Sequence, residues 1–232
     1  MAACPYSSGA LGHPGGTELT VHALTQAGLS SGARLLDLGC GEGESVGLLR
    51  RLGYTVEGLD ADLGHASQGI QHSDAALGLP YDDAAFDGVL AECSLSLMEN
   101  QTGVIRECAR VLRPGGCIMI SDLYARNPGG IAAVRTAGGC TQGIFLREEL
   151  VTQLQQAGFE EIRFEDHSRE LCSAMARFIF EHGPVEELWN CSDSAEGAKL
   201  AAAMKLARAG YFLCLAVRMK SGRRMVGGSY GG

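Results

Sequence analysis

The chain has 232 residues, of which 46% are hydrophobic and 20% charged, a composition typical of a globular protein with a sizeable core. Its formal net charge is −8 and no basic stripe is visible, so we expect no nucleic-acid partner. Neither a secretion signal nor an apolar segment of membrane-spanning length is visible, so we expect no membrane partner and a cytoplasmic protein.

The first part of the chain, residues 1–16, shows no periodicity and fits either a frayed terminus or a lid over a ligand site. It contains Tyr6 and His13. A short helix is expected next, with Thr17 as its N-cap and Gly28 as its end.

The following stretch has the pattern of half a doubly wound nucleoside-binding site. An apolar run over 34–38 predicts a buried parallel strand, and a turn with glycines at 39, 41 and 43 follows it. A helix is expected from Glu44 to Gly53. A second strand over 54–59 then ends on Asp60. A bare turn lets a ligand lie against backbone N–H groups, and an acid at the end of the second strand can accept both hydroxyls of a ribose.

The spacing of this turn distinguishes between two kinds of cofactor. Dinucleotide sites favour G-x-G-x-x-G, whereas the glycines here run G-x-G-x-G, and Asp37 stands two residues before the first of them. A carboxylate at that position suits the cationic amino-acid end of a ligand better than a diphosphate. The pattern therefore favours S-adenosylmethionine over a nicotinamide cofactor.

Residues 35–43, Leu-Leu-Asp-Leu-Gly-Cys-Gly-Glu-Gly, closely resemble the first motif of class I S-adenosylmethionine-dependent methyltransferases. The resemblance implies a doubly wound, mostly parallel seven-stranded α/β sheet of the Rossmann-like type. It also implies a set of residues along the methionine and ribose of the cofactor: Asp37, Gly39, Cys40, Gly41, Asp60 and Ala61. In several members an aromatic residue near the N-terminus covers the methyl donor, and Tyr6 matches that role.

A second region, over 79–90, resembles the subclass of these enzymes that includes quinone-biosynthesis methyltransferases, as does the run Arg-Val-Leu-Arg-Pro-Gly-Gly at 110–116. In that subclass the acid that matches Asp74 meets the amino group of the adenine. The residue that matches Ala75 offers its backbone N–H to the same ring. The resemblance thus implies that both residues bind the cofactor.

The fourth strand is expected to carry Glu92 and Cys93 to the carboxyl edge of the sheet, where ligands of such folds bind. Both residues would then lie near the cofactor and its transferable methyl group, although Cys93 equally fits a small core residue. A general base is needed only if the acceptor carries a proton. Glu92, His13 and Tyr124 are the candidates for that role.

The nine cysteines form no C-x-x-C pair, so we predict no metal site and expect reduced thiols. The segment 121–145 nevertheless resembles arsenite methyltransferases, in which the cysteine that matches Cys140 is one of the thiolates that hold trivalent arsenic. Under that alternative, Cys140 acts with two of Cys4, Cys93 and Cys172. A chance thiol in a loop explains Cys140 equally well.

The whole chain is expected to form one methyltransferase domain. Its parts are a lid at 1–16, a cofactor-binding core at 17–165, a helical insertion at 166–210 that covers the substrate, a last strand at 211–219 that runs antiparallel at the sheet edge, and a flexible tail at 220–232.

Three functions stay open at this point. The first is methyl transfer to a small-molecule acceptor by a monomer or homodimer, the second is arsenite methylation, and the third is binding of S-adenosylmethionine without catalysis.

Overall fold

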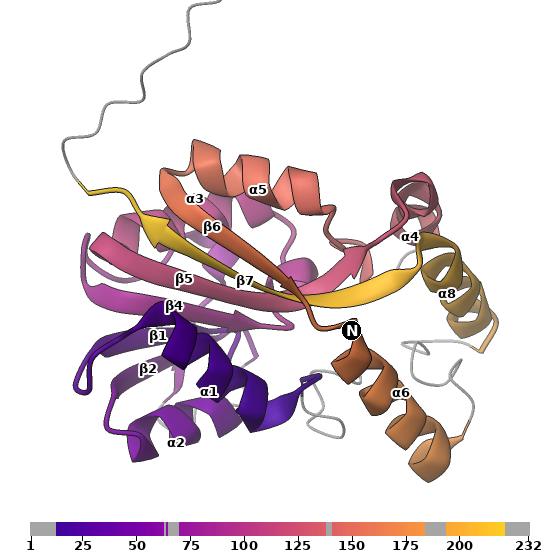
Figure 1. The fold of residues 1–232 in the computed structure, drawn as a ribbon, viewed down its shortest axis with the longest axis horizontal. Helices are drawn as coiled ribbons and strands as arrows, with labels where there is room; N and C mark the ends of the chain where they lie inside the picture. Colours follow the sequence, from indigo (N-terminus) through magenta and orange to yellow (C-terminus); the bar gives the residue numbers. More distant parts are fainter. Residues whose placement is uncertain (1–12, 63, 65–69, 138–140, 184–193, 221–232) are drawn as a thin grey trace, which may run out of the picture.

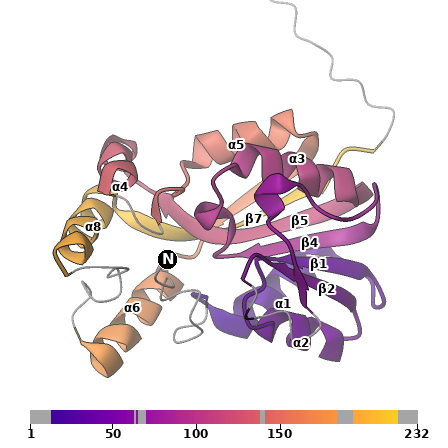
Figure 2. The same ribbon diagram turned by 180° about the vertical axis from the view of Figure 1, so that it is seen from behind.

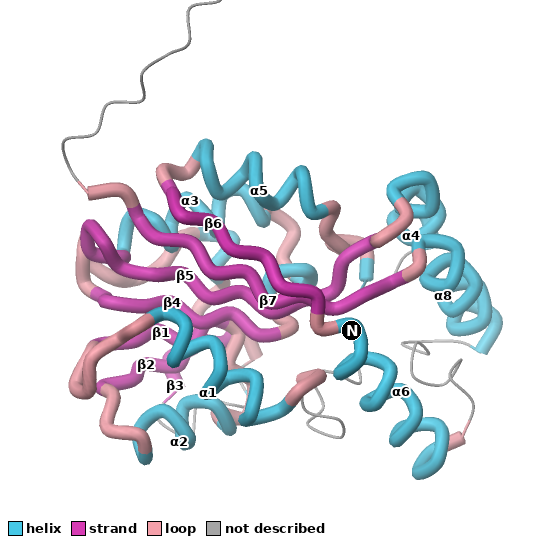
Figure 3. Tube along the Cα trace, in the orientation of Figure 1, coloured by secondary structure: helices cyan, strands magenta, loops and turns pink. Residues whose placement is uncertain are grey.

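The computed structural model describes residues 13–62, 64, 70–137, 141–183 and 194–220. A seven-stranded sheet in the order β3-β2-β1-β4-β5-β7-β6 forms its centre (Figures 1 and 3). The strands are β1 Arg34–Leu38, β2 Thr55–Asp60, β3 Ile70–His72, β4 Phe86–Glu92, β5 Leu112–Ala125, β6 Phe159–Asp166 and β7 Ala209–Arg218. Strands β1 to β5 are parallel, and β7 is antiparallel to both of its neighbours. The predicted fold class is confirmed.

Helices cover both faces of the sheet (Figures 1 and 2). The first group, α1 Gly16–Ala27 and α2 Glu44–Arg51, lies on one face, and the second, α3 Gln101–Val111 and α5 Arg147–Gln156, lies on the other. The remaining helices, α4 Ile131–Ala137, α6 Ser168–His182 and α8 Ser194–Ala207, gather where β5 ends and β7 begins. The last two belong to the predicted insertion.

The position of the last strand corrects one prediction. Strand β7 is antiparallel as expected, but it lies between β5 and β6 and not at the edge of the sheet. Its central residues, 210–216, are all buried, which suits a strand covered on both faces. Strand β6 carries charged residues at alternate positions and forms the edge, where such residues discourage pairing with other chains.

The register of the parallel strands brings their carboxyl ends together at one edge of the sheet. Asp37 at the end of β1 pairs with Gly58 of β2 and Leu90 of β4. Asp60 ends β2, and Glu92 ends β4 opposite Ser121 of β5. The acidic residues that the sequence singled out therefore share the edge at which ligands of doubly wound sheets bind.

Among the described residues, no helix combines the length and the apolar character that a membrane crossing requires.

Candidate functional site

The glycine turn after β1 is held tightly on one side and faces open space on the other. The amides of Gly39 and Cys40 both donate to the carbonyl of Leu59 in β2, at 2.7 and 3.2 Å. At Gly39, whose φ is +71°, a Cβ atom would come within 2.4 Å of the Ser94 Cβ. At Gly41, whose φ is +52°, a Cβ atom would meet nothing within 4 Å. A ligand can therefore approach the backbone at Gly41.

Asp60 helps to build this turn. One of its carboxylate oxygens accepts a hydrogen bond from the amide of Gly41 at 2.8 Å, and the other accepts from the amide of Asp62 at 2.8 Å. A carboxylate offers about four acceptor positions, so each oxygen keeps capacity for a further donor. Asp60 is half-buried and is thus accessible to a ligand.

Asp37 is the least satisfied acid of this edge. The residue is 2% exposed, and its Oδ2 atom has no hydrogen-bond partner among the described residues. Burial raises the pKa of the Asp37 carboxyl well above its usual value, and the nearby charges of Glu92 and Asp60 raise it further. A cation placed next to Asp37 would relieve both penalties, so the site is suited to a positively charged ligand group.

Glu92 is the centre of a buried polar cluster that joins three parts of the chain. Its Oε1 accepts from the hydroxyl of Thr20 in α1 at 2.9 Å, and its Oε2 accepts from the hydroxyl of Ser45 in α2 at 2.6 Å. Nε2 of His13 lies 3.5 Å from the same Oε2 and 3.3 Å from the Thr20 hydroxyl. Nδ1 of His13 is buried without a partner among the described residues. The cluster therefore contains one imidazole nitrogen for which the described residues supply no hydrogen-bond partner.

Cys93 follows Glu92 in a strained backbone conformation, with a φ of +50°. Its sulfur lies 3.1 Å from the hydroxyl of Tyr211, which in turn donates to the Ser121 hydroxyl at 3.1 Å. Burial raises the pKa of the Tyr211 hydroxyl well above its usual value, and the nearby Cys93 adds a smaller increase. A chain of polar groups thus runs from the edge of the sheet into β5 and β7.

The residues expected at the adenine follow β3 at the same edge. Asp74 is exposed, and its carboxylate accepts from the amide of Ala76 at 2.9 Å, while Ala75 is buried. Ala61, which follows Asp60, is exposed. Cys40 is half-buried, and burial raises the pKa of its thiol well above the usual range. Such a thiol is a neutral packing group and not a nucleophile at neutral pH.

Tyr124, the third candidate for a general base, lies apart from the cluster around Glu92. It is three residues beyond Ser121 on β5, so its side chain points to the opposite face of the sheet. There its ring packs edge-on against Phe164 and Phe212. Burial raises the pKa of its hydroxyl, which is hydrogen-bonded to Asp166. Tyr6, Cys4 and Cys140 lie outside the described residues.

Sequence patterns gave no indication of several residues that shape the site. Thr20 and Ser45 read as ordinary helix residues, and Tyr211 as part of an apolar strand. Asp122 near the end of β5 is 1% exposed, and its oxygens accept from the amides of Ser96 at 2.9 Å and Leu123 at 2.7 Å. Burial raises the pKa of Asp122 to about 6 against the opposing effect of these hydrogen bonds. An acid at the end of an apolar run was the one sequence feature that could have pointed to Asp122.

Comparisons with known proteins show which family the chain resembles. A family model described as a methyltransferase domain matches residues 36–120. The chain is 34% identical over 172 residues to 27-O-demethylrifamycin SV methyltransferase of Amycolatopsis mediterranei, a match that covers 66% of this chain and 63% of the relative. It is 32% identical over 154 residues to O-methyltransferase rstn1 of Aspergillus nomiae, a match that covers 58% of this chain and 68% of the relative.

Among solved structures, the crystal structure of the [4+2]-cyclase SpnF superposes with a TM-score of 0.65 at 26% identity, covering 88% of this chain and 80% of that one. The chain spans about half to two thirds of the length of the first curated relatives that it matches. The family match, the relatives and the motif order at the sheet edge agree, and the chain belongs to the class I S-adenosylmethionine-dependent methyltransferase family.

Proposed function

We propose that this chain transfers the methyl group of S-adenosylmethionine to a hydroxyl group of a small organic molecule. The observation that carries the proposal is that two buried polar groups without hydrogen-bond partners in the described part of the chain lie at the same edge of the sheet. Among the described residues, Asp37 has a buried carboxylate oxygen without a donor, and His13 has a buried ring nitrogen without a partner. The first suits a cationic donor molecule and the second suits an acceptor that must lose a proton.

The donor would be held along the carboxyl ends of β1, β2 and β3. Asp37 would pair with the ammonium of its methionine part, next to the backbone of Gly39, Cys40 and Gly41. Asp60 would accept the ribose hydroxyls, with Ala61 beside it, and Asp74 and Ala75 would meet the adenine. The unsatisfied Asp37 oxygen and the open space at Gly41 are the features of this chain that fit such a ligand.

S-adenosylmethionine supplies a methyl group that is already activated, so the protein mainly aligns the two reactants and excludes water. A neutral hydroxyl still has to lose its proton as it is methylated. His13 would accept that proton at Nδ1. Glu92, with Oε2 at 3.5 Å from Nε2, would orient the imidazole and stabilise its charged form. Thr20 and Ser45 would hold Glu92 in place.

The printed names of the two curated matches described above also favour an oxygen acceptor, because one is an O-methyltransferase and the other is named for a 27-O-demethyl substrate. They give no support to the arsenite hypothesis, in which Cys140 was the principal thiolate. The similarity to a cyclase shows that a shared fold does not fix the reaction, so the test has to detect methyl transfer itself.

The first experiment measures binding and turnover separately. Calorimetry with S-adenosylmethionine, and with NAD as the control ligand, tests the donor site, and the Asp60→Ala variant should bind the donor at least about tenfold more weakly. Formation of S-adenosylhomocysteine with a panel of phenols, alcohols and amines then tests transfer. Donor binding without turnover on any acceptor would favour a non-catalytic protein, and binding of NAD alone would overturn the family-based site.

The role of His13 is tested with the acceptor that this panel identifies. His13→Ala should lower kcat by about 100-fold or more, since a positioned base typically contributes that much. Donor affinity should change little. His182→Ala, on an exposed part of α6, serves as the matched control. Methylation of amines with an unchanged rate in His13→Ala would contradict the hydroxyl acceptor and the base together.

A further inference from the structure

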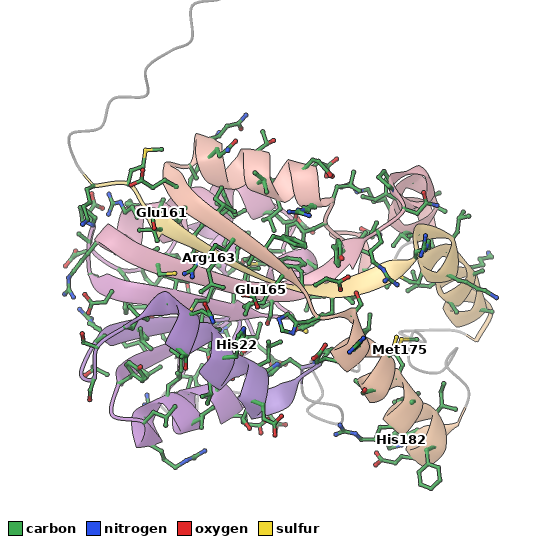
Figure 4. All side chains as sticks on the ribbon, viewed as in Figure 1. His22, Glu161, Arg163, Glu165, Met175 and His182 are labelled. Carbon is green, nitrogen blue, oxygen red and sulfur yellow. The ribbon has the colours of Figure 1, made fainter. Side chains whose placement is uncertain are left out.

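A second cluster of ligand-forming side chains lies away from the sheet edge, where α1 meets the end of β6. Figure 4 labels two of its members, His22 and Glu165, which project toward each other from the helix and the strand. The third member is His167, directly after β6. Each offers one ligand atom, and these atoms all lie within 4.8 Å of one another. We propose that His22, Glu165 and His167 bind a divalent transition-metal ion, with Zn²⁺ as the ion that the ligand set fits best.

The distances within the cluster are close to those of a metal site. Nε2 of His22 lies 2.8 Å from Oε2 of Glu165, and Nε2 of His167 lies 3.2 Å from the same oxygen. In tetrahedral zinc sites the metal–ligand bonds are about 2.0 to 2.2 Å long, which puts neighbouring ligand atoms about 3.4 Å apart. Shifts of a few tenths of an ångström, within the reach of side-chain rotation, would therefore open a position for the ion.

The donor set has the right chemistry for such an ion. Two imidazoles and one carboxylate suit zinc and its neighbours, whereas calcium and magnesium prefer oxygen ligands alone. The cluster is partly exposed, with 17% of the His167 side chain and 40% of the His22 side chain accessible, which leaves a path for the ion.

The surroundings of His167 fit the outer shell of a metal site. Its backbone amide donates to the carbonyl of Tyr211 at 2.8 Å, which fixes the residue at the end of the sheet. Its Nδ1 lies 3.7 Å from Oε1 of Glu170, one turn into α6. A small rotation of Glu170 would let its carboxylate accept a hydrogen bond from Nδ1 of His167 and leave Nε2 for the metal, an arrangement common to metal-binding histidines.

A metal ion here would fasten α1 to the sheet. The same two elements are already joined by Arg163, whose guanidinium donates to the carbonyl of Gln26 at 2.8 Å. His22 is two residues from Thr20, which reaches Glu92 at the carboxyl edge. An ion bound by His22 would therefore stabilise the helix that positions Glu92, without touching the ligands proposed for that edge. Because His22 and Glu165 are 143 residues apart, no spacing motif signals this cluster.

The test is titration of the full reduced chain with Zn²⁺ in competition with a chromophoric chelator. The wild type should bind one equivalent that raises its Tm. Removal of a ligand in His22→Ala, Glu165→Gln or His167→Ala should weaken that equivalent by more than about tenfold, and Glu170→Gln should weaken it by about tenfold. Glu165→Gln keeps a hydrogen-bond acceptor between the imidazoles, so it remains informative if an alanine variant folds poorly.

Two controls separate this site from the cysteines and from general histidine binding. His182→Ala removes an exposed imidazole from α6 and should bind Zn²⁺ like the wild type. Co²⁺ in place of Zn²⁺ should give a spectrum without thiolate charge-transfer bands. Three outcomes would each overturn the proposal and leave a purely hydrogen-bonded cluster. They are thiolate bands for the tightly bound equivalent, an unchanged affinity in all three ligand variants, and no binding of Zn²⁺.

Discussion

Asp37 and Asp122 are aspartates at the carboxyl ends of parallel strands, and they differ sharply in what surrounds them. Both are almost fully buried, at 2% and 1% exposure. Asp122 receives two backbone hydrogen bonds, one to each oxygen, from Ser96 and Leu123. Asp37 has an oxygen without a partner in the part of the chain that the structure describes, and it lies near the charges of Glu92 and Asp60.

The difference separates an acid that supports the fold from one that is kept ready for a ligand. A buried carboxylate with two backbone donors ties the turn after β4 to β5 and contributes to stability. A buried carboxylate without a donor costs stability until something cationic arrives. Proteins accept such local costs mainly at functional sites, so the contrast supports the proposal that β1 meets the ligand.

The largest expected effect follows from removing the charge at β1. Asp37→Asn should weaken donor binding by about 100-fold, since a charge-assisted pair with the donor ammonium is worth about 2 to 3 kcal/mol. The same substitution should raise the stability of the donor-free protein by about 1 kcal/mol, because an uncompensated buried charge is lost. Calorimetry and urea unfolding measure the two effects. Unchanged affinity, or lower stability, would remove the distinction between the two aspartates.

The matching change at β5 should have the opposite effect on the fold. Asp122→Asn replaces one acceptor oxygen with an NH₂ group that faces a backbone amide. This should lower the free energy of unfolding by about 1 to 2 kcal/mol, since a buried amide loses its partner. Donor affinity should stay within about twofold, because Asp122 is not among the residues proposed to meet the donor. If Asp122→Asn raised the free energy of unfolding, both buried aspartates would destabilise the fold and the distinction between them would be lost.

Sequence patterns predict the β1 side of this comparison far better than the β5 side. The strand, the glycine turn and Asp60 are consecutive in the chain, so their spacing alone brings Asp37 to the ligand edge. The partners of Glu92 come from α1 and α2, and Thr20 is 72 residues away. Such contacts depend on how whole helices pack, which no local period encodes.

The dependence on long-range packing also explains why the place of β7 in the sheet was predicted wrongly. The apolar run after residue 209 predicts a strand, but its place in the sheet depends on which neighbours it pairs with. The family pattern suggested the edge, but the buried centre of β7 and the charged residues of β6 are consistent with the observed order, in which β6 forms the edge.

A smaller effect concerns the turn between the two acids. Gly41→Ala should cost about 1 kcal/mol of stability, because a φ of +52° is unfavourable for a residue with a Cβ. Gly28→Ala is the matched control, since Gly28 has a φ of +63° and also faces open space. Only Gly41→Ala should weaken donor binding as well, by calorimetry, because its new methyl group would enter the space assigned to the donor. Equal donor affinity in both variants would place the ligand elsewhere.

The smallest expected effect is a pH dependence that distinguishes the two aspartates. The pKa of Asp37 is raised in the donor-free protein, and a bound cation would lower it again, so the donor prefers the ionised carboxylate. As pH rises through the raised pKa, donor affinity should therefore increase by at most about tenfold per unit, and it should level off above that pKa. Asp37→Asn should show no such rise over the range in which the donor's amino group stays charged, while Asp122→Asn should retain it. Calorimetry of the wild type and the two variants at matched ionic strength measures this pH dependence of donor affinity. If Asp122→Asn lost the rise and Asp37→Asn kept it, the cation would be assigned to β5 and not to β1.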